Sequence, residues 1–134
     1  MIKEKIHHQV EEMKLRRRMR IGEITWQFHD PDFSGNLQKV LRKFPKNDQD
    51  RIRLQILEGH AAFMEVHTMG KLNEEAYSQR LHDSYMTRED VYGVGYRMLR
   101  SYILAQGEQG SYMTPFKAMN KLLEEILNGT VEIK

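Results

Sequence analysis

Eight residues near the N-terminus repeat at the spacing of one face of a long α-helix. They follow one another at intervals of 4, 4, 3, 4, 4, 3 and 4 residues: Ile2, Ile6, Val10, Met13, Arg17, Ile21, Ile24 and Phe28. At 100° per residue these positions stay on one narrow stripe of a helix. A stripe that is this narrow and this long is typical of a helix that packs against another helix. We therefore predict a long N-terminal helix over residues 2–28.

The C-terminal part of this segment has two interpretations. The sequence His29-Asp30-Pro31-Asp32 should end the helix, because proline moves the preceding residue away from helical backbone angles. Apolar residues alternate from Ile24 to Phe28, as in a strand, and Gly22 weakens a helix interior by about 1 kcal/mol relative to alanine. We favour a continuous helix, with a strand over residues 23–28 as the alternative.

The apolar stripe also predicts an oligomer. A second copy of the same helix would cover it, and the expected interface consists of Ile6, Val10, Met13, Arg17, Ile21 and Ile24. Arg17 lies in the middle of the stripe, where burial of an unpaired guanidinium would cost several kcal/mol. It should therefore meet a carboxylate or a wet part of the seam, where a polar residue can fix register. In the alternative interpretation, the helix bends out of contact at Arg17.

A basic run overlaps the same segment. Lys14, Arg17 and Arg18 share one side of the helix, whereas Arg16 and Arg20 point almost the opposite way. The simplest interpretation is a solvated surface with pairs to Glu11, Glu12 and Glu23. The alternative is contact with nucleic-acid phosphates through Lys14, Arg16, Arg18 and Arg20. Contact with a membrane surface is disfavoured, because the apolar side lacks bulky interfacial anchors.

Composition limits the class of protein. The 134 residues have a net charge of +2, but residues 1–20 alone carry +4, so the remainder sums to −2. A basic surface is thus local to the N-terminal segment. The chain has no cysteine, which excludes thiolate chemistry and fits a reducing cytoplasm. No apolar run approaches the roughly 18 residues that cross a bilayer, and we expect neither a secretory signal nor a membrane segment.

Start and stop signals predict five further helices in a compact domain over residues 29–134. Ser34 resembles an N-cap for a second helix that ends before Pro45, and Asn47 opens a third that ends at Gly70. The third helix is apolar on two opposed faces, which include Leu57 and Phe63, so we expect it to be the central and most buried helix. Its predicted wet edge consists of Arg51, Gln55, Glu58 and Glu65.

The last three helices have equally clear signals. The fourth should run from Asn73 to about His82, and Thr87-Arg88-Glu89-Asp90 resembles a capping box for the fifth. The fifth should run to about Gln106 and stop at Gly107. Thr114-Pro115 should start the sixth, which ends at Asn128-Gly129. Its expected core face consists of Phe116, Met119, Leu122, Leu123 and Ile126.

Gly95 lies at the centre of the apolar face of the fifth helix. A missing side chain there lets another helix approach closely, so we interpret Gly95 as a packing position, with a hinge as the alternative. The fourth and fifth helices could also form a helix-turn-helix. In that minor interpretation, Arg88, Tyr96, Arg97 and Arg100 would be the exposed contact set.

The histidines do not predict a metal site. His60 and His67 share a face of the third helix but are seven residues apart, about 10 Å along the axis. Zinc sites on helices normally use histidines four residues apart. We therefore interpret both as core or interface histidines that hydrogen-bond to backbone or tyrosine, and we expect no metal and no cofactor.

Catalytic motifs are absent from the sequence. It contains no nucleophile elbow, no phosphate-binding loop and no dinucleotide fingerprint. We therefore predict an all-α protein, a long N-terminal helix over residues 1–28 followed by a bundle of about five helices, that is not an enzyme and takes no small-molecule substrate. The expected function is that of a small cytoplasmic regulator or adaptor, a homodimer that binds a protein partner. The alternative is a DNA- or RNA-binding protein that uses the Lys14–Arg20 surface.

Overall fold

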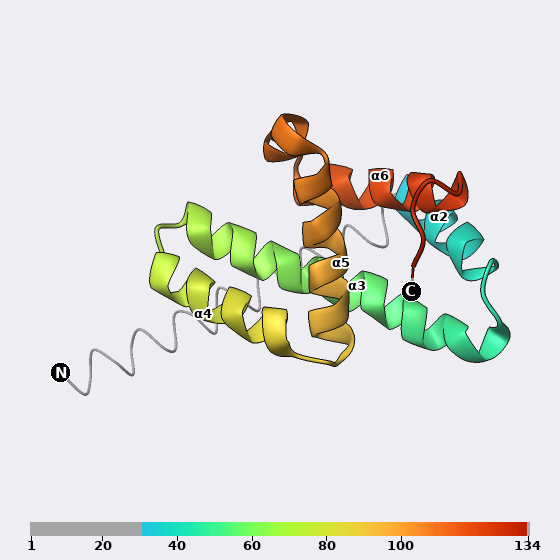
Figure 1. Cartoon of the computed structure of the whole chain (residues 1–134), viewed down its shortest axis with the longest axis horizontal. Helices are drawn as coiled ribbons and strands as arrows, with labels where there is room; N and C mark the ends of the chain where they lie inside the picture. The colour runs from blue at the N-terminus through green and yellow to red at the C-terminus, as the bar shows by residue number, and fades with distance from the viewer. Residues whose placement is uncertain (1–30, 134) are drawn as a thin grey trace.

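The computed structural model describes residues 31–133, and this part of the chain is helical and contains no strand (Figure 1). Its elements are, in order, α2 (Pro31–Leu41), α3 (Lys46–Lys71), α4 (Glu75–Thr87), α5 (Val91–Ala105), the 3-10 helix η1 (Gly107–Tyr112) and α6 (Pro115–Leu127). The all-α prediction is confirmed for these residues. The predicted helix over residues 2–28, the alternative strand over 23–28 and the proposed division at residue 28 lie outside the described residues.

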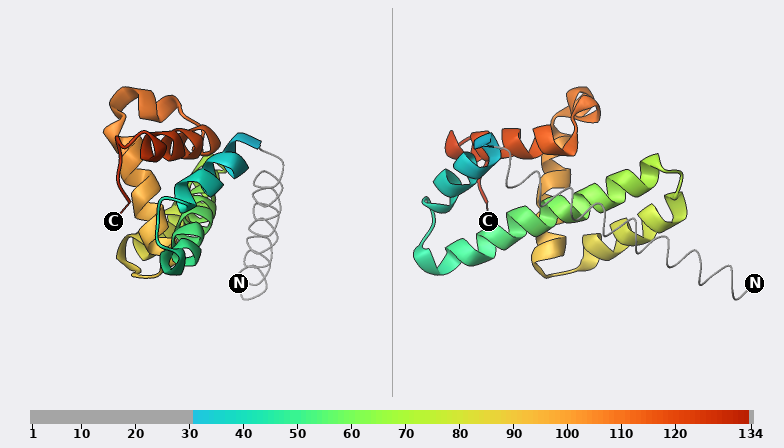
Figure 2. Two further views of the ribbon diagram at one scale, coloured as in Figure 1. Left: turned by 90° about the vertical axis from the view of Figure 1, so that its right-hand side faces the viewer. Right: turned by 180° about the vertical axis from the view of Figure 1, so that it is seen from behind.

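The long helix α3 forms the axis of the fold, as predicted. It contacts α2, α4, α5 and α6. Helix α4 returns alongside one half of α3, and α5 crosses α3 steeply near its middle (Figures 1 and 2). Helices α2 and α6 pack against each other over the other half. The central position of α3 follows from its length and from apolar residues on more than one face.

Two hydrophobic clusters fill the spaces around α3. The larger one joins α2, α3, α5 and α6, and its buried members are Phe33, Leu37, Val40, Leu41, Ile52, Ile56, Leu99, Tyr102, Ala118, Met119, Leu122, Leu123 and Ile126. The smaller one joins α3, α4 and α5 around Ala62, Tyr85 and Tyr96. Four of the five residues predicted for the core face of α6 are buried, and Phe116 is half-buried.

Polar contacts at helix ends fix α6 in place. The hydroxyl of Thr114 accepts the backbone N–H of Lys117 at 3.2 Å, and Pro115 occupies the first helical position, both as predicted. At the other end, the ammonium of Lys43 donates to the carbonyls of Ile126 (3.2 Å) and Leu127 (2.7 Å). A cation at these carbonyls is stabilised by the negative end of the helix dipole. The contact ties the loop after α2 to the end of α6.

The predicted starts of α2 and α3 are wrong by a few residues. Helix α2 already includes Pro31, the first described residue, so Ser34 lies inside the helix and is not an N-cap. Helix α3 begins at Lys46. The residue before it, Pro45, makes no capping hydrogen bond through its side chain, and Asn47 lies inside the helix.

The junctions on either side of α4 also differ from the prediction. Asn73 has φ of 61° in the turn after α3, a left-handed conformation that asparagine tolerates, and α4 continues to Thr87 instead of His82. The predicted capping box is wrong, because Thr87 is the last residue of α4 and its hydroxyl donates back to the carbonyl of Ser84 at 3.1 Å. Asp90 is the N-cap of α5 and accepts the N–H of Gly93.

The predicted wet edge of α3 is only partly exposed. Arg51 is exposed, but Gln55 is 6% exposed and Glu65 is 2% exposed. Gln55 is covered because the crossing helix α5 lies directly on its backbone. Leu57 and Phe63, which the opposed-face prediction placed in the core, are half-buried.

Candidate functional site

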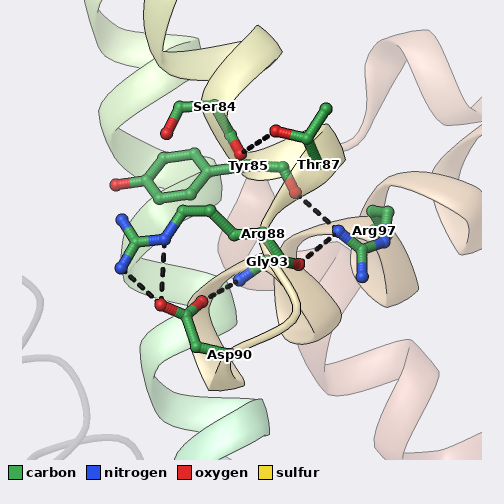
Figure 3. Close-up of polar contacts among 7 residues, drawn as sticks. All are labelled: Ser84, Tyr85, Thr87, Arg88, Asp90, Gly93 and Arg97. Carbon is green, nitrogen blue, oxygen red and sulfur yellow. Dashed lines mark hydrogen bonds and ion pairs between the residues drawn. The ribbon is translucent and has the colours of Figure 1, made fainter.

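The corner between α4 and α5 is held by Arg88 and Arg97, which the minor sequence interpretation assigned to the exposed contact set of a helix-turn-helix. Arg97 donates from Nη1 to the carbonyls of Tyr85 (2.8 Å) and Arg88 (2.7 Å) (Figure 3). Arg88 donates from Nε to the carboxylate of Asp90 at 2.9 Å, and a second nitrogen of its guanidinium contacts the same oxygen. The Arg88 guanidinium also lies over the ring of Tyr92 at 5.1 Å.

These contacts contradict the helix-turn-helix contact set. Tyr96 is 2% exposed, and its hydroxyl hydrogen-bonds with Nδ1 of His82 at 2.8 Å. Burial raises the pKa of the Tyr96 phenol. The hydrogen bond to Arg88 lowers the pKa of the Asp90 carboxyl, so this pair stays charged near neutrality. Arg97 and Tyr96 therefore hold the corner together and do not form an exposed surface.

The histidines of α3 lie in aromatic surroundings. The ring of His60 is buried and lies 5.5 Å from that of Phe116, and the ring of His67 stacks on Phe63 with centroids 6.2 Å apart. The tyrosine-bonded histidine is His82, which the sequence did not single out. Within residues 31–133, no group of three or more histidine and carboxylate side chains could hold a metal ion.

A hollow between α3 and α5 combines apolar walls with the cationic side chain of Arg100. We call it the Leu104 groove, and it is lined by Phe63, Val66, His67, Tyr96, Arg100, Ile103 and Leu104. Its volume is about 260 Å³. Leu104 is 60% exposed at its edge, so the groove is open to solvent and offers a large apolar side chain for contact.

The groove exists because of the way in which α3 and α5 cross. The two backbones meet at Gly59 and Gly95, where an added Cβ on Gly95 would lie 2.7 Å from the Cα of Gly59. The prediction that Gly95 permits close helix packing is thus confirmed. Because the helices cross steeply, they diverge beyond this point (Figure 1). The residues that follow on each helix line the space that opens between them.

The groove lining contains one cation, Arg100, and one imidazole, His67. Arg100 makes no ion pair or hydrogen bond with any residue of the described range, although its charge lowers the pKa of Tyr96 against the larger effect of burial. His67 has a pKa below its ordinary value of 6.5, first because of burial and second because of the positive charge of Lys71. At neutral pH the imidazole of His67 is therefore neutral, and Arg100 is the cation of the groove lining.

Two further hollows differ from the groove in character. One, of about 280 Å³, lies between α2 and α3 and is lined by Phe33, Ser34, Leu37, Gln38, Leu41, Arg53 and Leu57. The guanidinium of Arg53 in this lining forms an ion pair with the carboxylate of Asp50 at 2.8 Å. The other, also about 280 Å³, is polar and is lined by Tyr102, Gln106, Lys121, Glu124, Glu125 and Asn128. Burial and a hydrogen bond to Glu125 raise the pKa of Tyr102 there.

The site residues that the sequence predicted lie outside the described residues. This applies to the basic set Lys14, Arg16, Arg18 and Arg20 and to the interface set Ile6, Val10, Met13, Arg17, Ile21 and Ile24. The Leu104 groove was missed, because its lining combines residues of α3 with residues of α5 that are 29 or more positions further along the chain. The one signal in the sequence was Leu104 itself, a large apolar residue near the end of α5 that the predicted apolar face of this helix did not include; the structure leaves it exposed.

No protein-family model, curated protein or solved structure matches the chain. None of the helices within residues 31–133 is long and apolar enough to cross a membrane.

Proposed function

We propose that this protein is a small regulator or adaptor that acts by binding a protein partner, without catalysis, in a reducing compartment such as the cytoplasm. The Leu104 groove is the observation that carries this proposal. It places the exposed side chain of Leu104 beside a concave apolar surface, and the side chains that contribute most to binding at an interface are typically seated in pockets.

The size of the groove favours a peptide over a small-molecule substrate. Ligand pockets typically enclose about 300–1,000 Å³ and bury most of a drug-sized ligand. At about 260 Å³ and open to solvent, the groove is better matched to one or two side chains of a partner. Its lining includes the polar side chains of Arg100 and His67, which can orient a peptide by hydrogen bonds.

We also propose that the protein forms a homodimer, and the apolar stripe of residues 2–28 supports this. The stripe repeats over seven intervals, and a second copy would cover it without a further partner. Dimerisation would present two Leu104 grooves per assembly and would strengthen binding to a partner that carries two docking segments.

Nucleic-acid binding is the second candidate, and the sequence of residues 14–20 is the observation that favours it. Five lysines and arginines in this short range could neutralise phosphates and bind DNA or RNA with strong salt dependence. We rank it below protein binding, because these charges fall on different sides of a helix.

Selection from a random peptide library displayed on phage tests the proposed function. We expect peptides that bind the wild-type protein and lose binding to Leu104→Glu. Leu72→Glu is the matched control, because Leu72 is 49% exposed and does not line the groove. Equal binding to all three proteins would contradict a docking role for the groove.

A further inference from the structure

We infer that the Leu104 groove recognises an acidic–apolar peptide segment, in which a leucine or phenylalanine side chain enters the groove and a neighbouring aspartate or glutamate pairs with Arg100. This inference rests on the proposed function and specifies its partner. The occupant is identified by charge complementarity between Arg100 in the groove lining and a carboxylate of the segment.

Arg100 is the residue that would pair with the acidic side chain of the peptide. Four other arginines have defined roles within the described residues: Arg51 pairs with Asp48, Arg53 with Asp50, Arg88 with Asp90, and Arg97 with two carbonyls. Arg100 lines the groove, is half-buried and has no such contact within residues 31–133. A guanidinium presents several donors in a planar fork that matches a carboxylate, so a peptide acid is a suitable partner.

The charges around His67 also favour an acidic partner. The groups that act on His67 and Tyr96 through their charges are Lys71 on α3 and Arg100 on α5, and both are cations. A carboxylate in the groove would therefore be attracted by Arg100, which lines it. Apolar walls strengthen such a charge interaction relative to bulk water.

The apolar walls of the groove favour a ligand that also carries an apolar side chain. Phe63, Val66, Ile103 and Leu104 supply the hydrophobic lining, and the ring of Phe63 is stacked on His67. A purely acidic ligand would leave this lining in water, whereas a purely apolar ligand would leave Arg100 without a partner. The segment that satisfies both carries apolar and acidic side chains next to each other.

The test uses three synthetic pools of nine-residue peptides. Each pool has leucine or phenylalanine at its three central positions, and the flanking positions are aspartate and glutamate in the first pool, asparagine and glutamine in the second, and lysine and arginine in the third. Binding to the full-length protein is followed by NMR, from the backbone amide signals of Val66 and Ile103. We expect the acidic pool to bind about tenfold more tightly than the amide pool, with the difference shrinking as salt is added.

Variants assign this preference to the groove. Arg100→Gln should reduce the preference for the acidic pool to about twofold or less, and Arg100→Glu should shift it to the basic pool. Arg42→Gln is the control, because Arg42 is exposed and lies outside the groove. If the acidic and amide pools bind the groove equally well, the inference is wrong and the proposed function stands. If no pool shifts the groove signals, both are overturned.

Discussion

Gly59 of α3 and Gly95 of α5 face each other across the helix crossing, with no side chain between the two backbones. A Cβ on Gly95 would lie 1.9 Å from the carbonyl oxygen of Gln55, and a Cβ on Gly59 would lie 2.4 Å from the carbonyl carbon of Gly95. Both distances are far below van der Waals contact, and the atoms that they meet are backbone. This crossing holds α5 on α3 and places the two walls of the Leu104 groove.

Gly95→Ala and Gly59→Ala should each destabilise the protein strongly. The added methyl group would push two backbones apart, and overpacking of this kind costs about 1–3 kcal/mol or more. Gly35→Ala is the matched control, because Gly35 lies in α2 with open space around it and alanine should stabilise a helix by about 0.5–1 kcal/mol. Urea unfolding of the three variants measures these changes. A Gly95→Ala variant as stable as Gly35→Ala would contradict the close crossing.

Arg97→Met should loosen the corner between α4 and α5. The substitution keeps the aliphatic stem but leaves the carbonyls of Tyr85 and Arg88 without their charged donor, and such hydrogen bonds contribute about 1.5–3 kcal/mol. We expect a loss of this size and faster amide exchange over residues 84–93. The control is Arg80→Met, because Arg80 is an exposed residue of α4 whose guanidinium lies over the Tyr77 ring. Similar effects of both variants would argue against a structural role for Arg97.

His67 should make the folded state less stable in mild acid. Its folded pKa lies below 6.5, so as pH falls through 6.5 the unfolded chain takes up a proton before the folded protein does. The free energy of unfolding should therefore decrease as pH falls from about 6.5 to the folded pKa of His67, and recover as pH rises again. His67→Gln should remove this part of the pH dependence. Parallel stability curves for wild type and His67→Gln between pH 7.5 and 5.5 would disprove it.

The sequence predicted those parts of the fold that depend on neighbouring residues. Thr114 and Pro115 start α6 and Gly107 follows the end of α5, because caps and helix stops are local chemistry. Gly95 could be assigned to a close crossing, since it lies on the apolar face of its own helix. Its partner Gly59 was not identified, because nothing in the sequence shows which turn of α3 lies opposite Gly95.

Features that depend on tertiary contacts were predicted poorly. Gln55 and Glu65 are polar residues that a helical wheel places at a wet edge, but the crossing of α5 and the packing around α3 bury them. Ser34 and Asn47 have good capping chemistry, yet both lie inside helices that begin earlier in the chain. The candidate groove combines residues from two helices, so periodicity within one helix could not reveal it.

The stripe of residues 2–28 leads to a prediction about oligomeric state. Sedimentation at tens of micromolar should show a dimer for the full-length protein, because the apolar positions of the stripe need a partner helix. Deletion of residues 1–20 should leave a folded monomer with an unchanged helical circular dichroism signal per residue of the remaining domain. A full-length protein that is monomeric at this concentration would contradict the proposed dimer.

Affinity capture from cells that express the protein, with and without nuclease, tests most directly the claim that it works by binding a protein partner. We expect the same captured proteins in both conditions with wild type and with Leu72→Glu, and their loss with Leu104→Glu. Capture that disappears after nuclease treatment but is unaffected by Leu104→Glu would contradict the claim and favour nucleic-acid binding instead.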